Sequence, residues 1–184
     1  MRLETPRLRV RPWEARDLEP FAALNADPEV MRYFPRLMNR AESDVLVGRI
    51  LERTERNGFG FSVAERLSDG VFLGMVGVSR VELPGTVVDG MVEAGWRLAR
   101  AAWGQGYATE GAAAAISHAF ATLDLPEIVA FTAVPNLPSQ AVMRRLGMRR
   151  AEQLDFDHPA IPEGSPLRRH VSFTLARADW TAHP

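Results

Sequence analysis

The chain has 184 residues, of which 46% are hydrophobic, and its formal net charge is −1. This length predicts one domain, residues 1–184, with enough chain to bury a substantial core. The near-neutral charge gives no electrostatic case for binding nucleic acid or a membrane surface. Because the chain contains no cysteine, disulfides, a thiol nucleophile and cysteine metal sites are excluded.

Neither targeting nor membrane insertion is indicated by the sequence. The first residues are charged and interrupted by prolines, unlike a secretory signal peptide. No uninterrupted apolar run approaches the length that spans a membrane. We therefore expect a cytoplasmic protein with no membrane partner.

Hydrophobic periodicity predicts both helices and strands in the first half of the chain. We expect strands at residues 8–11, 59–65 and 72–81, the last two forming a hairpin. We expect helices at residues 17–25 and 42–57. The segment 27–35, aromatic and bounded by prolines, is expected to be irregular.

The second half repeats the mixture of helices and strands. We expect strands at residues 92–98, 128–134, 148–153 and 170–176. We expect a helix at residues 109–123 and a short one after residue 139, up to about residue 146. The segment 155–167, rich in Pro, Asp and Gly, is expected to be a functional or mobile loop.

The strand at 92–98 is expected to present two different faces, because side chains alternate along a strand. One face carries Val92, Ala94, Trp96 and Leu98. The other carries Glu93, Gly95 and Arg97. A glycine within a strand predicts either a bulge or a close approach to the backbone at Gly95.

A glycine-rich turn between this strand and the next helix has the composition of an anion cradle. Gly104 and Gly106 lack Cβ, so the backbone can come close to a ligand and adopt positive φ. The free N–H groups of the first helical turn then face a phosphate or pyrophosphate. Neither a P-loop nor the full dinucleotide fingerprint is present. A plain tight turn is the alternative reading.

Two motifs together resemble the GNAT acetyltransferase superfamily. The phosphate-loop pattern R/Q-x-x-G-x-G/A is similar to residues 101–106, and N-x-x-S-x-x-V-x-x-x-L-G-M is similar to residues 136–148. The residues 3–12, 169–171 and 178–180 look like the branch that contains ribosomal-protein N-terminal acetyltransferases (RimJ/RimL-like). Two positions depart from the family: Ala101 replaces the first Arg or Gln, and Met143 stands where many relatives carry a proton-donating Tyr.

The resemblance implies an α+β fold, with a mixed, mostly antiparallel sheet of about six to seven strands flanked by helices. The central strands splay apart and take up the pantetheine arm of acetyl-CoA, the co-substrate. The resemblance also allows a homodimer, because relatives often dimerise. The residues that the resemblance places on acetyl-CoA are Trp96, Leu98, Ala99, Trp103, Gly104, Gln105, Gly106, Tyr107, Ala108, Thr109, Asn136 and Ser139.

The implied chemistry is direct acyl transfer to an amine, without a covalent enzyme intermediate. Glu93 is the candidate base, and its alternative role is that of a solvated or paired strand carboxylate. Ser139 is the candidate donor to departing CoA, or else a first-turn hydroxyl bonded to the backbone. Asn136 binds ligand, caps its helix, or does both.

The acceptor pocket is expected to include Tyr33, Phe34 and Arg36 together with Glu93, although aromatic core filling is an equal alternative for the first two. Asp155, Asp157 and His158 superficially suggest a metal cluster, but such residues in one loop are usually solvated, so no metal is expected.

The sequence thus predicts an N-acetyltransferase that acts on a primary amine, either a protein N-terminus or a small molecule. A non-catalytic acetyl-CoA-binding or sensing module is the alternative, because of Ala101 and Met143. A protein with a nucleotide in the cradle is a third reading.

Overall fold

The computed structural model describes residues 2–181 and contains one sheet. Nine strands of the described chain run in the order β1-β2-β3-β4-β5-β6-β9-β7, with β8 paired to β9. The strands are β1 (Leu3–Glu4), β2 (Leu8–Arg11), β3 (Ser62–Arg66), β4 (Phe72–Arg80), β5 (Val92–Leu98), β6 (Glu127–Ala133), β7 (Arg149–Arg150), β8 (Phe156–Asp157) and β9 (Arg169–Ala176). The helices are α1 (Leu18–Ala26), α2 (Pro28–Met31), α3 (Arg40–Asn57), α4 (Tyr107–Thr122) and α5 (Leu137–Arg145).

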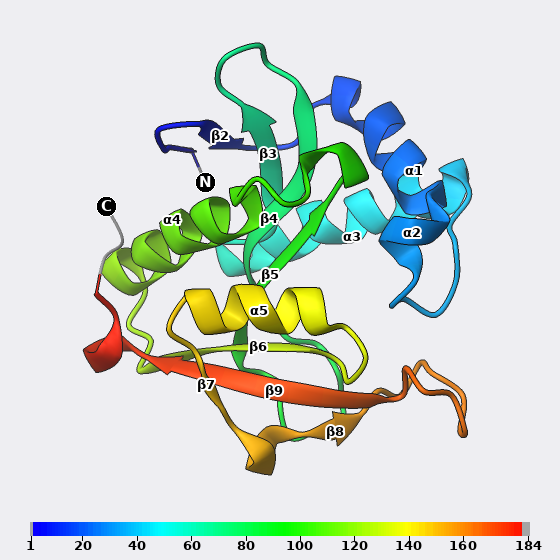
Figure 1. Ribbon diagram of the computed structural model, residues 1–184. Coiled ribbons are helices and arrows are strands. Elements are labelled where there is room, and N and C mark those ends of the chain that lie inside the picture. The colour runs from blue at the N-terminus through cyan, green and yellow to red at the C-terminus, as the bar shows by residue number, and fades with distance from the viewer. Residues whose placement is uncertain (1, 182–184) are drawn as a thin grey trace.

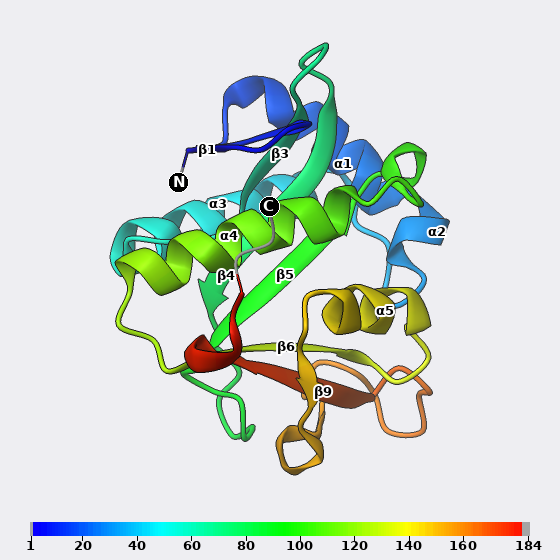
Figure 2. The same cartoon turned by 60° about the vertical axis from the view of Figure 1, so that its left-hand side comes forward.

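Alternating apolar residues of the central strands build a core on each face of the sheet. Val76 and Ala94 pack with α4 on one face, in a cluster that also includes Leu8 and Ile116. Met75 packs with α1 and α3 on the other face. Figures 1 and 2 show α4 and α3 enclosing this part of the sheet, while α5 lies beside β6. No helix of residues 2–181 is long and apolar enough to cross a membrane.

The sheet divides between β5 and β6, which are its only parallel pair within residues 2–181. The two strands are in register at a single pair, Glu93 and Val129, and then separate, as Figure 2 shows. The other strand pairs are antiparallel. This arrangement confirms the expected α+β fold with splayed central strands. The strand number exceeds six to seven because β1, β7 and β8 are two-residue segments.

The prediction of a strand at residues 148–153 is mostly wrong. Only Arg149–Arg150 is a strand, and a 3-10 turn follows at Glu152–Leu154. The Leu154 N–H donates to the Ala151 carbonyl at 3.0 Å, which turns the chain so that Phe156 pairs with His170 of β9. The segment 155–167 therefore begins with the short strand β8 instead of being wholly loop.

A bulge at Gly95 is also ruled out, because β4 and β5 pair without interruption from Gly74–Leu98 to Arg80–Val92. The alternative reading, a close approach, is what the structure has. A Cβ at Gly95 would lie 2.8 Å from the Phe61 ring. Glycine is needed here because an aromatic side chain lies directly on the strand.

Smaller differences concern helix ends. α3 begins at Arg40, since Asn39 and Glu42 form a reciprocal capping box that the sequence reading overlooked. α4 begins at Tyr107, two residues earlier than expected. The irregular segment 27–35 contains the one-turn helix α2, capped by Asp27.

Candidate active site

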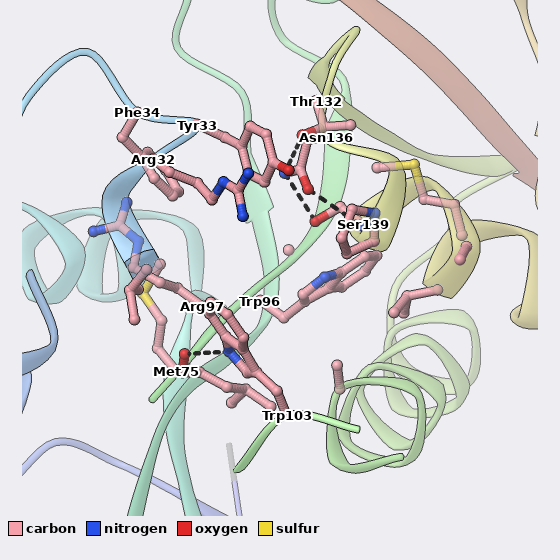
Figure 3. Close-up of a pocket in the computed structure, with 18 of the residues that line it drawn as sticks. Arg32, Tyr33, Phe34, Met75, Trp96, Arg97, Trp103, Thr132, Asn136 and Ser139 are labelled. Atoms are coloured by element: carbon pink, nitrogen blue, oxygen red, sulfur yellow. Dashed lines mark hydrogen bonds between the residues drawn. The ribbon is translucent and has the colours of Figure 1, made fainter. Parts of the chain in front are cut away.

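A cavity of about 810 Å³ opens where β5 and β6 separate. Its walls come from the segment after α2, from β4 and β5, from the turn before α4, from the β6–α5 connection and from the segment around residues 158–170. Figure 3 shows side chains from most of these elements directed toward one space. Segments distant in sequence thus meet at the division of the sheet.

The glycine-rich turn lies at one side of this cavity. Gly104 has φ 73° and Gly106 has φ 83°, both in the left-handed region that disfavours other residues. Glu110 donates its N–H to the Gly106 carbonyl at 3.0 Å, so the amides of Tyr107, Ala108 and Thr109 precede the first α-helical bond. These three residues line the cavity. The geometry fits the expected anion cradle.

The N-terminal segment braces the cradle, which local sequence reading did not reveal. The Arg7 guanidinium donates to the Gln105 carbonyl at 2.9 Å and to Glu110 Oε2 at 2.7 Å. Thr5 Oγ1 donates to Glu110 Oε1 at 2.6 Å. Arg7 also lies over the Tyr107 ring, 4.8 Å from its centroid. The turn and the first turn of α4 are therefore held in one arrangement.

We expect Gly106→Ala to weaken acetyl-CoA binding about tenfold, because left-handed φ costs an alanine about 1–2 kcal/mol. The new Cβ would also lie 3.3 Å from Arg7 Nη2. Titration calorimetry measures the Kd. Gly85→Ala is the matched control, since Gly85 has φ 84° in the connection between β4 and β5, which does not line the cavity. An equal loss of affinity in both variants would contradict a local role for Gly106.

Most of the residues expected on acetyl-CoA line the cavity, but Ala99 and Gln105 do not. Ala99 donates its N–H to the Leu73 carbonyl at 2.8 Å, so this N–H already has a partner within the protein. The Gln105 amide folds back to the Ala101 carbonyl at 2.7 Å. Trp103 Nε1 donates to the Leu98 carbonyl at 2.9 Å, so that carbonyl has a partner within the protein (Figure 3).

Asn136 organises two hydroxyl groups at the start of α5. Its Nδ2 donates to Thr132 Oγ1 at 2.8 Å and to Ser139 Oγ at 3.1 Å, while its Oδ1 accepts from the Ser139 N–H at 3.3 Å (Figure 3). Asn136 therefore caps α5 and also sets the direction of both hydroxyls. Since each hydroxyl accepts from Asn136, its own proton is directed elsewhere. Thr132 was missed by the sequence reading. Met143, which cannot donate a proton, also lines the cavity.

Glu93 lines the same cavity from β5, at the point where the strands begin to separate. Within residues 2–181 its carboxylate has no hydrogen bond or ion pair. Burial raises the pKa of Glu93 to about 7, opposed by the charge of Arg53. Arg53 itself pairs with Glu82 at 2.9 Å. An unpaired carboxylate that titrates near neutrality suits proton transfer.

The aromatic residues expected at the acceptor do line the cavity, whereas Arg36 does not. Tyr33 and Phe34 are part of its wall. Arg36 pairs with Glu42 at 2.7 Å on the surface, with 66% of its side chain exposed. The capping box of α3 explains this, because it places Glu42 beside the preceding segment.

Several cavity residues were not predicted to be functional. The sequence analysis noted only that Arg97 shares a strand face with Glu93. That alternation of side chains was the available signal that Arg97 also lines the cavity. His170 stacks on Phe156 with centroids 5.3 Å apart, and burial lowers the pKa of His170 to about 4. Burial also lowers the pKa of His158. Phe61 also lines the cavity and was not predicted to do so.

The three residues of the suggested metal cluster, Asp155, Asp157 and His158, each have different neighbours. Asp155 binds Arg150 and the Ser172 N–H. Asp157 lies near Arg169, at 3.5 Å, and His158 faces the cavity. Among the described residues no group of three or more such ligands comes together.

Comparison with known proteins shows the family to which the chain belongs. The acetyltransferase (GNAT) domain family matches residues 7–149, and the chain belongs to this family. It is 31% identical to the FsC-acetyl coenzyme A-N(2)-transacetylase of Aspergillus fumigatus, over 97% of this chain and 77% of that protein. The acetyltransferase from Agrobacterium tumefaciens str. C58 has a similar structure, with a TM-score of 0.77, 25% identity, and coverage of 95% of this chain and 94% of that one.

A second similar structure is the ribosomal-protein-S5-alanine acetyltransferase from Vibrio fischeri. Its TM-score is 0.75 at 16% identity, with 98% of this chain and 99% of that one covered. At this identity the likeness concerns the fold. The family membership makes the protein an acyltransferase of the GNAT type, and acetyl-CoA is the co-substrate of that family.

Proposed function

We propose that this chain, as a single domain, moves an acetyl group from acetyl-CoA to a primary amine inside the cavity between β5 and β6. One observation carries the proposal: the cavity has a braced anion cradle at one side and the unpaired carboxylate of Glu93 in its wall. The cradle suits the pyrophosphate of acetyl-CoA. The separated strands leave room for an extended arm that bonds to strand backbone.

In the proposed reaction the acceptor nitrogen forms a bond to the acetyl carbon as the carbon–sulfur bond breaks. Glu93 takes the proton that the amine loses, through a water. Ser139 donates a hydrogen bond or proton to the departing thiolate, and Asn136 keeps its hydroxyl in that direction. Catalysis then consists of positioning and proton transfer, without an acyl-enzyme.

An α-amino group is the acceptor that needs least help from the protein. With a pKa near 8 it is roughly 10% neutral at pH 7, whereas a lysine amine with a pKa near 10.4 is below about 0.1% neutral. A base with a pKa of about 7 is adequate for the first kind of amine. The name of the Aspergillus relative, an acetyl coenzyme A-N(2)-transacetylase, supports a nitrogen atom as the acceptor.

A protein N-terminus is the alternative acceptor in this proposal, and it would place the chain in the branch of the ribosomal-protein N-terminal acetyltransferases. Its support is the resemblance of residues 3–12, 169–171 and 178–180, together with the shared fold. Measuring acetyl transfer to a panel of peptide N-termini and small amines distinguishes the two acceptor classes.

A ligand series tests the co-substrate. We expect acetyl-CoA and CoA to raise the melting temperature, and ATP and NAD to leave it unchanged. A ligand at about 100 times its Kd adds roughly 2.7 kcal/mol to the free energy of unfolding. Equal stabilisation by ATP would favour a nucleotide in the cradle, and no stabilisation by acetyl-CoA or CoA would overturn the proposal.

A further inference from the structure

One cationic side chain of the cavity wall has no anionic partner within residues 2–181. Arg97 is on the same face of β5 as Glu93 and lines the same cavity. Its Nη1 donates to Asn25 Oδ1 at 2.6 Å, and its Nε is buried with no acceptor in residues 2–181. No carboxylate of the described chain lies within ion-pair distance of it. Only a neutral amide therefore contacts this guanidinium through a hydrogen bond.

The guanidinium is held in place and does not move freely in solvent. Asn25 is fully buried, and its Nδ2 donates to Ser43 Oγ at 2.9 Å, which orients its Oδ1 toward Arg97. The guanidinium carbon lies 4.0 Å from the centroid of the Phe34 ring. Burial lowers the pKa of Arg97 to about 10, so the group remains charged at neutral pH. A fixed, charged fork with open donor positions is the arrangement that binds carboxylates.

The other charged residues of the cavity wall do not supply the missing anion. Glu29 pairs with Arg32 at 3.5 Å. Burial lowers the pKa values of His158 and His170, and an imidazole supplies no anion. Glu93 is four residues away along β5, about 13 Å between Cα positions for an extended strand. A buried charge is costly unless a partner compensates for it.

We propose that the acceptor carries a carboxylate as well as its amine, and that Arg97 binds this carboxylate. The inference rests on the proposed function, because it places the amine beside Glu93. The aromatic wall of Tyr33, Phe34 and Phe61 then contacts the body of the acceptor between its two ends. A polyamine is disfavoured, since a second ammonium would face Arg97. The carboxylate belongs either to a free amino acid or to a side chain of a peptide.

Matched acceptors test the inference. We compare kcat/KM for free amino acids and their carboxamides, and for C-terminally amidated peptides with Asp or Asn at the second position. The wild type is expected to prefer the acid to the amide in one of these two comparisons. A preference among the amino acids identifies a free amino acid as the acceptor, and a preference for Asp over Asn identifies a peptide side chain. Arg97→Gln is expected to lower the acid-to-amide ratio at least about tenfold, as for loss of a hydrogen bond to a charged group. Comparing this ratio between the wild type and Arg97→Gln cancels the different amine pKa values within each pair, because both proteins act on the same amines.

Arg36→Gln is the matched control, because it removes a cation near Phe34 in sequence but outside the cavity. Its acid-to-amide ratio is expected to equal that of the wild type. The melting temperature of Arg97→Gln shows whether the variant folds. A purely structural role for Arg97 predicts an equal fall for acid and amide, and that result overturns the inference.

Binding provides a readout that does not depend on turnover. In the presence of CoA, an N-acetyl amino acid or acetylated Asp peptide is expected to bind more tightly than its amide counterpart, and Arg97→Gln to remove the difference. Equal affinity of every acid and amide pair for the wild type overturns the inference. Absence of turnover with every amine, together with an Arg97-dependent acid preference in binding, would instead contradict only the proposed acetyl transfer.

Discussion

Glu93→Gln is expected to lower kcat/KM by about 10²–10⁴-fold at pH 8, the usual contribution of a positioned general base. The glutamine keeps the size of the side chain in the cavity wall but cannot take a proton from the acceptor. Because Glu93 has no ion pair within residues 2–181, its loss breaks no salt bridge. Steady-state release of the CoA thiol measures the effect.

The pH dependence separates a base from a structural carboxylate. Glu93 becomes deprotonated as the pH rises through about 7. The wild-type kcat/KM should therefore rise through that pH, and again near the pKa of the acceptor amine, about 8 for an α-amino group. Glu93→Gln should keep only the rise that belongs to the amine. An unchanged pH profile in the variant would show that Glu93 is not the base.

Stability should change in the opposite direction to activity. Burial raises the pKa of Glu93 from 4.5 to about 7, so the folded state holds a proton that the unfolded state releases between these values. The stabilising contribution of this carboxyl is present below about pH 4.5 and is lost as the pH rises through about 7. We therefore expect Glu93→Gln to melt at a higher temperature than the wild type at pH 8, with little difference at acidic pH.

Asn136→Asp is expected to lower kcat/KM about 10²-fold while leaving the melting temperature nearly unchanged. Aspartate caps a helix as well as asparagine does, so the bond from the Ser139 N–H is kept. However, a carboxylate cannot donate to the hydroxyls of Thr132 and Ser139. The Ser139 hydroxyl would instead donate to Asp, and its proton would no longer face the thiolate. Misdirection of one group in a reacting site can cost about this factor.

Two companion measurements make the Asn136 prediction specific. Ser139→Ala should reduce kcat by at least about tenfold with little change in the Kd of acetyl-CoA, if its hydroxyl contacts the departing sulfur. The double variant Asn136→Asp, Ser139→Ala should be little worse than Asn136→Asp alone, because both changes remove the same donor. Full additivity of the two losses, or normal turnover by Asn136→Asp, would show that Asn136 only caps α5.

Local sequence patterns predicted the elements that form the cradle and the cavity edge. The alternation along β5 placed Glu93 and Arg97 on one face and Trp96 on the other, as the pairing with β4 shows. Gly104 and Gly106 indicated positive φ, which both adopt. These features depend on neighbouring residues alone, so one sequence is sufficient to read them.

Contacts between distant segments could not be predicted in this way. Arg7 reaches the turn before α4 from the first strand pair, and Phe61 covers Gly95 from the start of the β3 hairpin. Arg36 looked like a cavity residue because Phe34 is one, but the α3 capping box draws it to Glu42. The strand expected at residues 148–153 ends at Arg150, and a 3-10 turn follows at Glu152–Leu154. Tertiary packing decided the first two cases, whereas the last two were decided by local capping and turn hydrogen bonds that the sequence reading overlooked.

The most direct test of the account is mass spectrometry of an amine panel incubated with acetyl-CoA and the wild-type protein, with Glu93→Gln alongside. The panel holds peptide N-termini, amino acids and their amides, polyamines and an aminoglycoside antibiotic. The account predicts an acetylated amine in equal amount to released CoA, and far less product with Glu93→Gln. Tight binding of acetyl-CoA with no acetylated product from any amine would contradict it, and would favour a sensing module.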